Sequence, residues 1–502
     1  MDLFSSLIYG FGLALQPSNL LFCFIGVFLG TLVGVLPGIG PVGTIALLLP
    51  LTFKLSPVTG IIMLAGIYYG SMYGGSTTSI LINIPGETSS VVTCLDGYQM
   101  ALRGRAGPAL GIAAFGSFIA GSVGLAGLVL IANPLADLAV KFGPAEYFSL
   151  LCLGLVALTF LSQGSVLRGL SMASLGLFLS LIGQDVVTGT IRFSFGLVRL
   201  EGGLDLVPVM MGLFGISEVL LNVEKLGDER HIVKAEITNL LPSKSDWRQS
   251  AMPIARGTIL GFFLGLLPGG GAIMSSFFSY TVEKKLSRHP ENFGQGAIEG
   301  VAGPESANNS ATSAAFIPLF SLGIPGTMTT AILLGAFIIH GVQPGPMLLS
   351  QHPEIFWGTV ASMYVGNVLL LVLNLPLIGM WVQLLRAPYR TLFPLILFFC
   401  LVGAFSGSMD TAGIYLMLIF GVAGYVLRKL SYEPAPLVLA FVLGPMFERN
   451  LRQALIISDG SPMVFLTHPI SLGALLICFL FLLWAILPSL RRKRRLAMSE
   501  EQ

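Results

Sequence analysis

Two segments rich in hydroxyl and amide side chains lie within long apolar stretches of this sequence. The first includes Ser76 and Thr77, and the second includes Asn308, Asn309 and Ser310. Such side chains donate hydrogen bonds to an anion without carrying charge, although a single Ser or Thr in a membrane helix often joins two helices. The adjacent amides fit that structural role poorly, because they are expected to point to opposite sides and to need many partners. We therefore expect all five side chains to contact a bound anion.

Glu87 and Glu305 are the acidic residues nearest to these segments. A carboxylate at membrane depth is costly, which makes each one a candidate functional group. Each also follows a glycine or a proline and can instead cap the N-terminus of a helix, and the sequence leaves both interpretations open. For a cation bound beside the anion, we expect Glu305 and Thr312 to be the ligands. Asp96 lies farther along the chain and is expected in a polar loop.

Proline and glycine occur together at corresponding places in the two halves of the chain. The tripeptide LPG occupies 36–38 and 267–269, and IPG occupies 84–86 and 324–326. Proline removes a backbone donor and glycine permits non-helical angles, so each pair is expected to end a helix. The free N–H groups and the positive dipole end of a following half-helix can bind an anion. The backbone donors expected at this site belong to Gly38, Gly40, Gly269, Gly270 and Gly271.

These motifs belong to an internal repeat. LGTLVGVLPGIGP, from Leu29, matches LGFFLGLLPGGGA, from Leu260. Between LPG and IPG, placing Gly70 over Gly303 aligns two segments rich in Gly, Ser, Thr and Asn, and we expect both segments to be further helix breaks. Broken backbone at membrane depth is tolerated only where protein buries it or where it lines a water-filled cavity. Corresponding breaks in two halves are therefore the best sequence indicator of a transporter's binding site.

The composition indicates that these segments lie in a membrane. The chain has 502 residues, of which 54% are hydrophobic and only 10% are charged, compared with about 25% in soluble domains. A membrane-spanning helix needs roughly 20 apolar residues, and we expect an all-α polytopic membrane protein with about 12 such segments. The segments are expected to form two repeats that carry broken helices or re-entrant hairpins. An odd number of apolar segments separates the two LPG motifs, which favours inverted repeats.

A polar stretch divides the chain into two membrane halves. The tail after the last apolar segment contains RRKRR, and positive charge next to a span marks the cytoplasmic side. We therefore expect the C-terminus in the cytoplasm. The expected parts are an N-terminal membrane half with the first repeat at 1–223, a polar cytoplasmic linker at 224–250, a C-terminal membrane half with the second repeat at 251–490 and a basic cytoplasmic tail at 491–502.

Other features exclude classes of protein. A net charge of +2 without a basic stripe gives no surface for nucleic acid. The five cysteines form no CxxC pair and the five histidines form no HExxH motif, so we expect no metal site other than one for a sodium ion, and no cofactor. His340 is the only histidine well inside an apolar stretch, and it is expected to be a hydrogen-bonded interface residue. The N-terminus lacks the pattern of a cleaved signal peptide.

In these motifs the sequence resembles the large membrane subunit of the tripartite tricarboxylate transporters of bacteria. The resemblance covers nearly the whole chain. It rests on GVLPGIGP at 34–41, YYGSMYGGSTTSILINIPGE at 68–87, GLLPGGG at 265–271 and GPESANNSATSAAFIPLFSLGIPG at 303–326. It implies a secondary transporter of the bacterial inner membrane that works with a small four-helix membrane subunit and a periplasmic solute-binding protein. It also implies import of carboxylates such as citrate, usually with sodium ions or protons.

Two classes of function therefore remain open. Cation-coupled carboxylate uptake by alternating access explains the paired breaks and the absence of an ATP-binding P-loop. The alternative is a passive anion channel or an intramembrane enzyme. An enzyme would need a Ser/His or paired Asp pattern within the spans, and a channel would not need Pro-Gly breaks that match between the halves.

Overall fold

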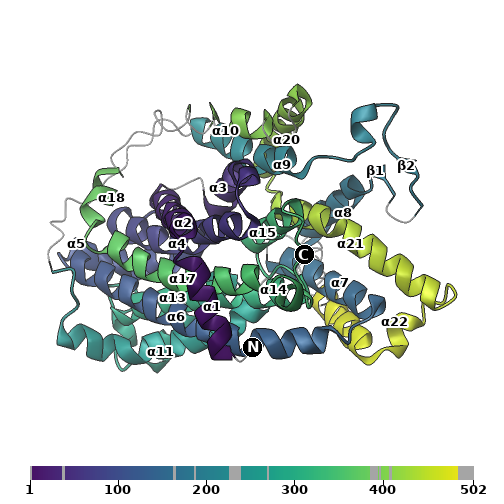
Figure 1. Cartoon of the computed structure of the whole chain (residues 1–502). Helices are drawn as coiled ribbons and strands as arrows, with labels where there is room; N and C mark the ends of the chain where they lie inside the picture. Colours follow the sequence, from purple (N-terminus) through teal and green to yellow (C-terminus); the bar gives the residue numbers. More distant parts are fainter. Residues whose placement is uncertain are drawn as a thin grey trace, which may run out of the picture. The chain divides into compact units, whose positions relative to one another are not determined.

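Helices account for nearly all of the regular structure (Figure 1). The computed structural model describes residues 3–36, 40–161, 166–185, 188–224, 239–267, 271–384, 394, 397–398, 400–405 and 410–483. In these ranges the only sheet is a two-stranded antiparallel hairpin, in which β1 (Gly183–Gln184) pairs with β2 (Ile191–Arg192). The expected all-α fold is therefore confirmed.

The chain folds into two compact units, and neither is continuous in sequence. The first comprises residues 1–139 and 205–425, and the second comprises 140–204 and 426–502. Helix α20 (Thr411–Lys429) crosses the boundary at its end. The other helices of the first unit are α1 (Leu3–Ala14), α2 (Pro17–Val35), α3 (Gly40–Leu48), η1 (Leu49–Lys54), α4 (Pro57–Ile82), η2 (Thr88–Ser90), α5 (Val91–Leu102), α6 (Ala106–Ala139), α9 (Leu206–Met210), the π-helical η4 (Met211–Ile216), α10 (Ser217–Glu224), α11 (Lys244–Leu266), α12 (Gly271–Leu286), η5 (Pro290–Asn292), α13 (Glu299–Ala314), α14 (Phe316–Leu322), α15 (Met328–Ile339), α16 (Leu348–Gln351), α17 (Pro353–Asn374) and α18 (Ile378–Leu384).

The second unit contains α7 (Pro144–Leu161), α8 (Val166–Ser180), β1 (Gly183–Gln184), β2 (Ile191–Arg192), η3 (Val198–Leu200), α21 (Ala435–Ile457) and α22 (Val464–Thr467). Its β-hairpin is tied to α21 by ion pairs. Arg192 contacts Glu448 at 2.8 Å, and Arg452 contacts Asp185 at 3.0 Å. These contacts neutralise charge that would otherwise be unfavourable close to apolar helices.

Four helices in the described part of the chain are long and apolar enough to cross a membrane. They are α2, α6, α17 and α20, and shorter apolar helices accompany them. The long helices contain few charged residues, as expected of segments that face lipid or other apolar helices. The chain is thus an integral membrane protein.

A helix ends directly before the leucine of each LPG motif, as the sequence predicts. Helix α2 ends before Leu36, which is extended, and α3 begins at Gly40 with φ +65°. In the second repeat α11 ends before the extended Leu267, and α12 begins at Gly271 with φ +40°. A positive φ is readily adopted only by glycine, which explains why this residue opens both half-helices.

Both IPG motifs also interrupt a helix. Helix α4 ends before Asn83 and α14 ends before Gly323, and both of these capping residues have left-handed backbone angles. The next helix begins in each case with a capping box, in which Glu87 caps η2 and Thr327 caps α15. Of the two interpretations that the sequence leaves open for Glu87, the structure shows the helix cap.

The polar segments between LPG and IPG are continuous helix, so the prediction of further breaks there is wrong. Helix α4 runs unbroken through Ser76 and Thr77, and α13 runs through Asn308 and Asn309. Glycine weakens an isolated helix, but here it lets two backbones approach closely. A Cβ atom on Gly30 would lie 2.5 Å from the carbonyl oxygen of Ile67, so α2 and α4 pack in direct backbone contact.

The same packing corrects the alignment of the two repeats. Gly26 of α2 lies against the backbone of Met63, and its counterpart Gly257 of α11 lies against the backbone of Gly303. Gly303 therefore corresponds to Met63 and not to Gly70, a shift of seven residues or about two helical turns. Shared composition suggested the wrong pairing, whereas the residue that each glycine faces determines the register.

Candidate functional site

Glu305 lies at the centre of a buried polar cluster on α13, with 0% of its surface exposed. Its carboxylate accepts hydrogen bonds from Ser76 Oγ at 2.6 Å, from Asn308 Nδ2 at 3.1 Å and from the hydroxyl of Thr93. No Lys, Arg or His of the described residues forms an ion pair with it. Neutral donors from α4, α5 and α13 thus hold this carboxylate, which satisfies its oxygens without a basic partner.

Asn309 extends the cluster to α6. Its Nδ2 donates to Ser117 Oγ at 2.7 Å and to the carbonyl oxygen of Glu305 at 3.0 Å. Oδ1 of Asn308 is a third acceptor that shares these two N–H groups, so the two amides are linked to each other. The expectation that they point to opposite sides is wrong. Their side chains bend into one network because each amide offers both a donor and an acceptor.

Ser310 and Thr312 lie on α13 but direct their hydroxyls elsewhere. Ser310 Oγ donates to the carbonyl oxygen of Thr258 on α11 at 2.8 Å, and Thr312 Oγ1 donates to the carbonyl oxygen of Asn308 at 2.8 Å. Hydrogen bonds from a hydroxyl to helix backbone are typical of helix-joining residues in membranes. Of the residues predicted as ligands, the structure brings together Ser76, Asn308, Asn309 and Glu305.

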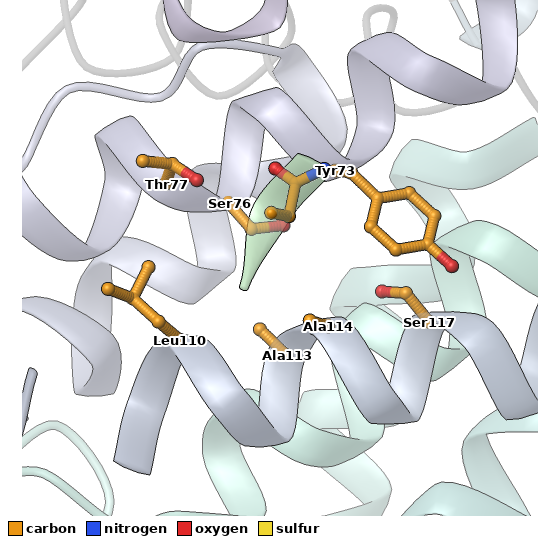
Figure 2. Close-up of a pocket in the computed structure, with 8 residues that line it drawn as sticks. Tyr73, Ser76, Thr77, Leu110, Ala113, Ala114 and Ser117 are labelled. Carbon is orange, nitrogen blue, oxygen red and sulfur yellow. The ribbon is translucent and has the colours of Figure 1, made fainter. Parts of the chain in front are cut away.

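A small cavity of about 10 Å³ adjoins this cluster. Figure 2 shows its two walls, with Tyr73, Ser76 and Thr77 on α4 facing Ser117 and three apolar residues on α6, and Asn374 at the end of α17 completes the lining. The volume is close to the minimum of about 10–15 Å³ for one water molecule and far below the roughly 300–1,000 Å³ of small-molecule pockets. In this conformation the cavity can therefore hold an ion or a water molecule but not a carboxylate substrate.

The structure describes two of the five glycines in and after the LPG motifs that were predicted as backbone donors. Gly40 and Gly271 each begin a half-helix, and their carbonyl oxygens accept hydrogen bonds from Thr44 at 2.8 Å and from Ser275 at 2.7 Å. These bonds are equivalent in the two repeats and stabilise the first turn of each half-helix. The other predicted backbone donors, Gly38, Gly269 and Gly270, lie outside the described residues.

Asp96 is not a loop residue, contrary to expectation. It is fully buried on α5, where its Oδ1 accepts the backbone N–H groups of Gly294, Gly296 and Ala297 at 2.8–2.9 Å. Tyr280 donates to its other oxygen at 3.0 Å. A buried carboxylate is tolerated when several donors compensate for lost hydration. Asp96 thus fixes the segment that leads into α13 and thereby positions Glu305.

Three further residues of the site were not predicted. Thr93, Ser117 and Asn374 belong to none of the repeated motifs, and the residues around them in the site are distant in sequence. The only signal for Thr93 is its place shortly after the IPG motif.

His340 is hydrogen-bonded to Thr52 at 2.9 Å, as expected of an interface residue. No group of three or more His, Cys, Asp or Glu side chains that could hold a metal ion occurs in the described ranges.

Comparisons with known proteins agree with these features. The Tripartite tricarboxylate transporter TctA family matches residues 20–439. An uncharacterised 52.8 kDa protein in the TAR-I ttuC' 3' region of Agrobacterium vitis is 53% identical over 501 residues, which covers 100% of both chains. An uncharacterised protein in the TAR-II ttuC' 3' region of the same organism is 52% identical over 234 residues, covering 47% of this chain and 97% of that protein. No solved structure matches the chain.

Proposed function

Because the chain belongs to the tripartite tricarboxylate transporter TctA family, we propose that it imports carboxylates by cation-coupled alternating access. Its partners in this proposal are a small four-helix membrane subunit and a periplasmic solute-binding protein. The proposed setting is the bacterial inner membrane, with about 12 spans, inverted repeats and a cytoplasmic C-terminus.

The observation that carries the proposal is the environment of Glu305. A fully buried carboxylate is held there by hydroxyl and amide donors alone, and these donors come from α4, α5 and α13. Each hydrogen bond to a charged group contributes about 1.5–3 kcal/mol. Hydroxyl and amide donors of this kind can therefore bind the carboxylate of a substrate without a salt bridge. The cluster around Glu305 offers such neutral donors.

In the proposed site the substrate contacts Ser76, Thr77, Asn308 and Asn309, together with backbone N–H groups of the LPG glycines. Ser76 and Asn308 donate to Glu305 in the present conformation. Substrate binding therefore requires these donors to release the carboxylate of Glu305 and to bind that of the substrate. The adjoining cavity is far too small for a substrate, and the exchange must accompany opening of the helices around it. Such opening and closing is what alternating access demands.

Uptake into proteoliposomes tests the function. The chain is reconstituted with its small membrane subunit, the solute-binding protein is added outside, and uptake of radiolabelled citrate is measured with and without an inward sodium or proton gradient. Saturable uptake that depends on the gradient supports the proposal. Flux that rises linearly with concentration or voltage would instead indicate a channel, and chemical conversion of the citrate would indicate an enzyme.

A further inference from the structure

Asn374, the last residue of α17, has a buried oxygen without a partner. The residue is 4% exposed, and its Nδ2 donates to the carbonyl oxygen of Leu370 at 2.9 Å. Its Oδ1 has no hydrogen-bond partner among the residues that the structure describes. Nearly all buried polar atoms in proteins are satisfied, so this oxygen, at the edge of the cavity beside Glu305, indicates that the cavity binds a ligand that is a donor or a cation.

The hydroxyl groups around the cavity favour a cation. Ser76 directs its proton to Glu305 at 2.6 Å, and Ser117 already accepts the amide N–H of Asn309 at 2.7 Å. Their oxygens therefore offer lone pairs, and the amide oxygen of Asn374 offers more. A set made of carbonyl and hydroxyl oxygens suits a hard cation, not a transition metal.

Size and charge define the cation further. The cavity volume of about 10 Å³ leaves room for one ion without a hydration shell. Glu305 is the only carboxylate bonded to a residue of the cavity lining in the described part of the chain. The single negative charge of Glu305, which the Ser76 hydroxyl separates from the cavity, is balanced by an ion with a single positive charge. The attraction between the two charges is strong because the site is buried.

We propose that this cavity is a binding site for a small monovalent cation, with the oxygens of Asn374, Ser76 and Ser117 as ligands and Glu305 as the charge partner. The proposal rests on the proposed function, in which a cation accompanies the carboxylate, and it places the ion between α4, α6 and α17. Thr312 is not part of this site, because it does not line the cavity. Bound there, the cation joins the end of α17 to Ser76 on α4 and Ser117 on α6.

Thermal unfolding of the purified full-length chain, without any carboxylate, tests the site. Sodium, potassium and choline chlorides are titrated at constant ionic strength. Sodium is expected to raise the unfolding temperature with a saturable midpoint, because a ligand that binds only the folded state stabilises it. Asn374→Leu is expected to raise that midpoint by at least about tenfold, and Asn374→Asp is expected to lower it, because a carboxylate adds negative charge at the ion.

Ser306→Ala is the matched control. Ser306 has a buried hydroxyl on α13, which donates to its own helix at Ala302, and it does not line the cavity. Its sodium midpoint should equal that of the unmodified chain. Equal stabilisation by all three salts, no stabilisation by sodium, or an unchanged midpoint in Asn374→Leu would overturn the proposal. If Asn374→Leu does not fold, the midpoint of Asn374→Asp decides, and a midpoint that is not lower would count against the site.

Thermal unfolding with sodium and uptake of citrate together distinguish a failure of the cation site from a failure of the proposed function. A sodium response that depends on Asn374, in a protein that does not take up citrate, would support the cation site and contradict the carboxylate transport. Citrate uptake by a protein that shows no sodium-specific stabilisation would support the transport and overturn the site.

Discussion

Helices α4 and α13 are equivalent in the two repeats but carry different side chains. Both pack through small residues, against α2 and α11 respectively. With Met63 equivalent to Gly303, the counterparts of Glu305 and Asn308 are Ala65 and Tyr68. The duplication has thus preserved the backbone packing in both repeats while confining the buried carboxylate and its amide to one. A repeated scaffold therefore does not imply a repeated binding site.

The largest expected effect comes from adding the missing carboxylate to the first repeat. Ala65 is fully buried, and the residue one turn farther along is Tyr68, whose hydroxyl lies 3.4 Å from that of Thr327. Ala65→Glu would therefore bury a charge without the donors that surround Glu305. An uncompensated buried charge costs about 3–5 kcal/mol, so little folded protein is expected. The unfolding temperature of the purified protein checks this, with Ala65→Ser as the control. A stable Ala65→Glu variant would show that the first repeat also accommodates a carboxylate.

Removing the amide from the second repeat is expected to impair transport. Asn308→Ala deletes a donor to a charged group worth about 1.5–3 kcal/mol, which corresponds to a rise in the KM for citrate of roughly tenfold to a hundredfold. The equivalent change in the first repeat, Tyr68→Phe, should alter the KM by less than about threefold. Ser310→Ala serves as a control, because its hydroxyl contacts α11. A normal KM for Asn308→Ala at equal expression would remove Asn308 from the binding site.

The shared packing predicts similar effects of glycine substitution in both repeats. A Cβ atom on Gly261 would lie 2.1 Å from the carbonyl oxygen of Ala307, and one on Gly30 would lie 2.5 Å from that of Ile67. Each Gly→Ala variant should lose about 1–3 kcal/mol of stability, because the helices must move apart. Gly12→Ala is the control, since nothing lies within 4 Å of the added methyl group. Loss of stability in only one repeat would contradict the equivalence of the two interfaces.

The smallest effect concerns how the equivalent helices α2 and α11 begin. The start of α2 has no side-chain cap, whereas α11 begins with a capping box between Ser243 and Asp246. Asp246 lies in the polar first turn, before the apolar stretch. Burial raises the pKa of this carboxyl, but hydrogen bonds from Ser243 and the adjacent Arg105 guanidinium outweigh it and hold the pKa below its ordinary value of 3.8.

The sign of the pH dependence follows from this lowered pKa. The carboxylate contributes its full stability above the unfolded pKa of 3.8, and the contribution is lost as the pH falls from there through the lower folded pKa. Asp246→Asn should cost about 0.5–2 kcal/mol near neutral pH. It should also flatten the fall of the unfolding temperature as the pH drops from 3.8 through the lower folded pKa. The same acid sensitivity in Asp246→Asn as in the unmodified chain would exclude Asp246 as its source.

The sequence predicts the interruptions of helices better than it predicts their contacts. The Pro-Gly pairs at LPG and IPG break helices because of local backbone chemistry, which is readable from a few residues. The segments around Ser76 and Asn308 seemed equally prone to break, but their glycines and alanines are stabilised by a partner helix that lies elsewhere in the chain. Glu305 was found because a carboxylate is conspicuous in an apolar stretch. Thr93 and Asn374 were not, because their importance arises only from neighbours more than 200 residues away in sequence.

The burial of Asp96 has a mechanical consequence. This carboxylate, on α5 of the first repeat, accepts three N–H groups from the entry to α13 of the second repeat and the hydroxyl of Tyr280 on α12. Any displacement that separated α5 from the entry to α13 would remove three N–H donors at once from a buried charge. Helices α5 and α13 are therefore expected to move together as one rigid body, with any hinge of the molecule outside them.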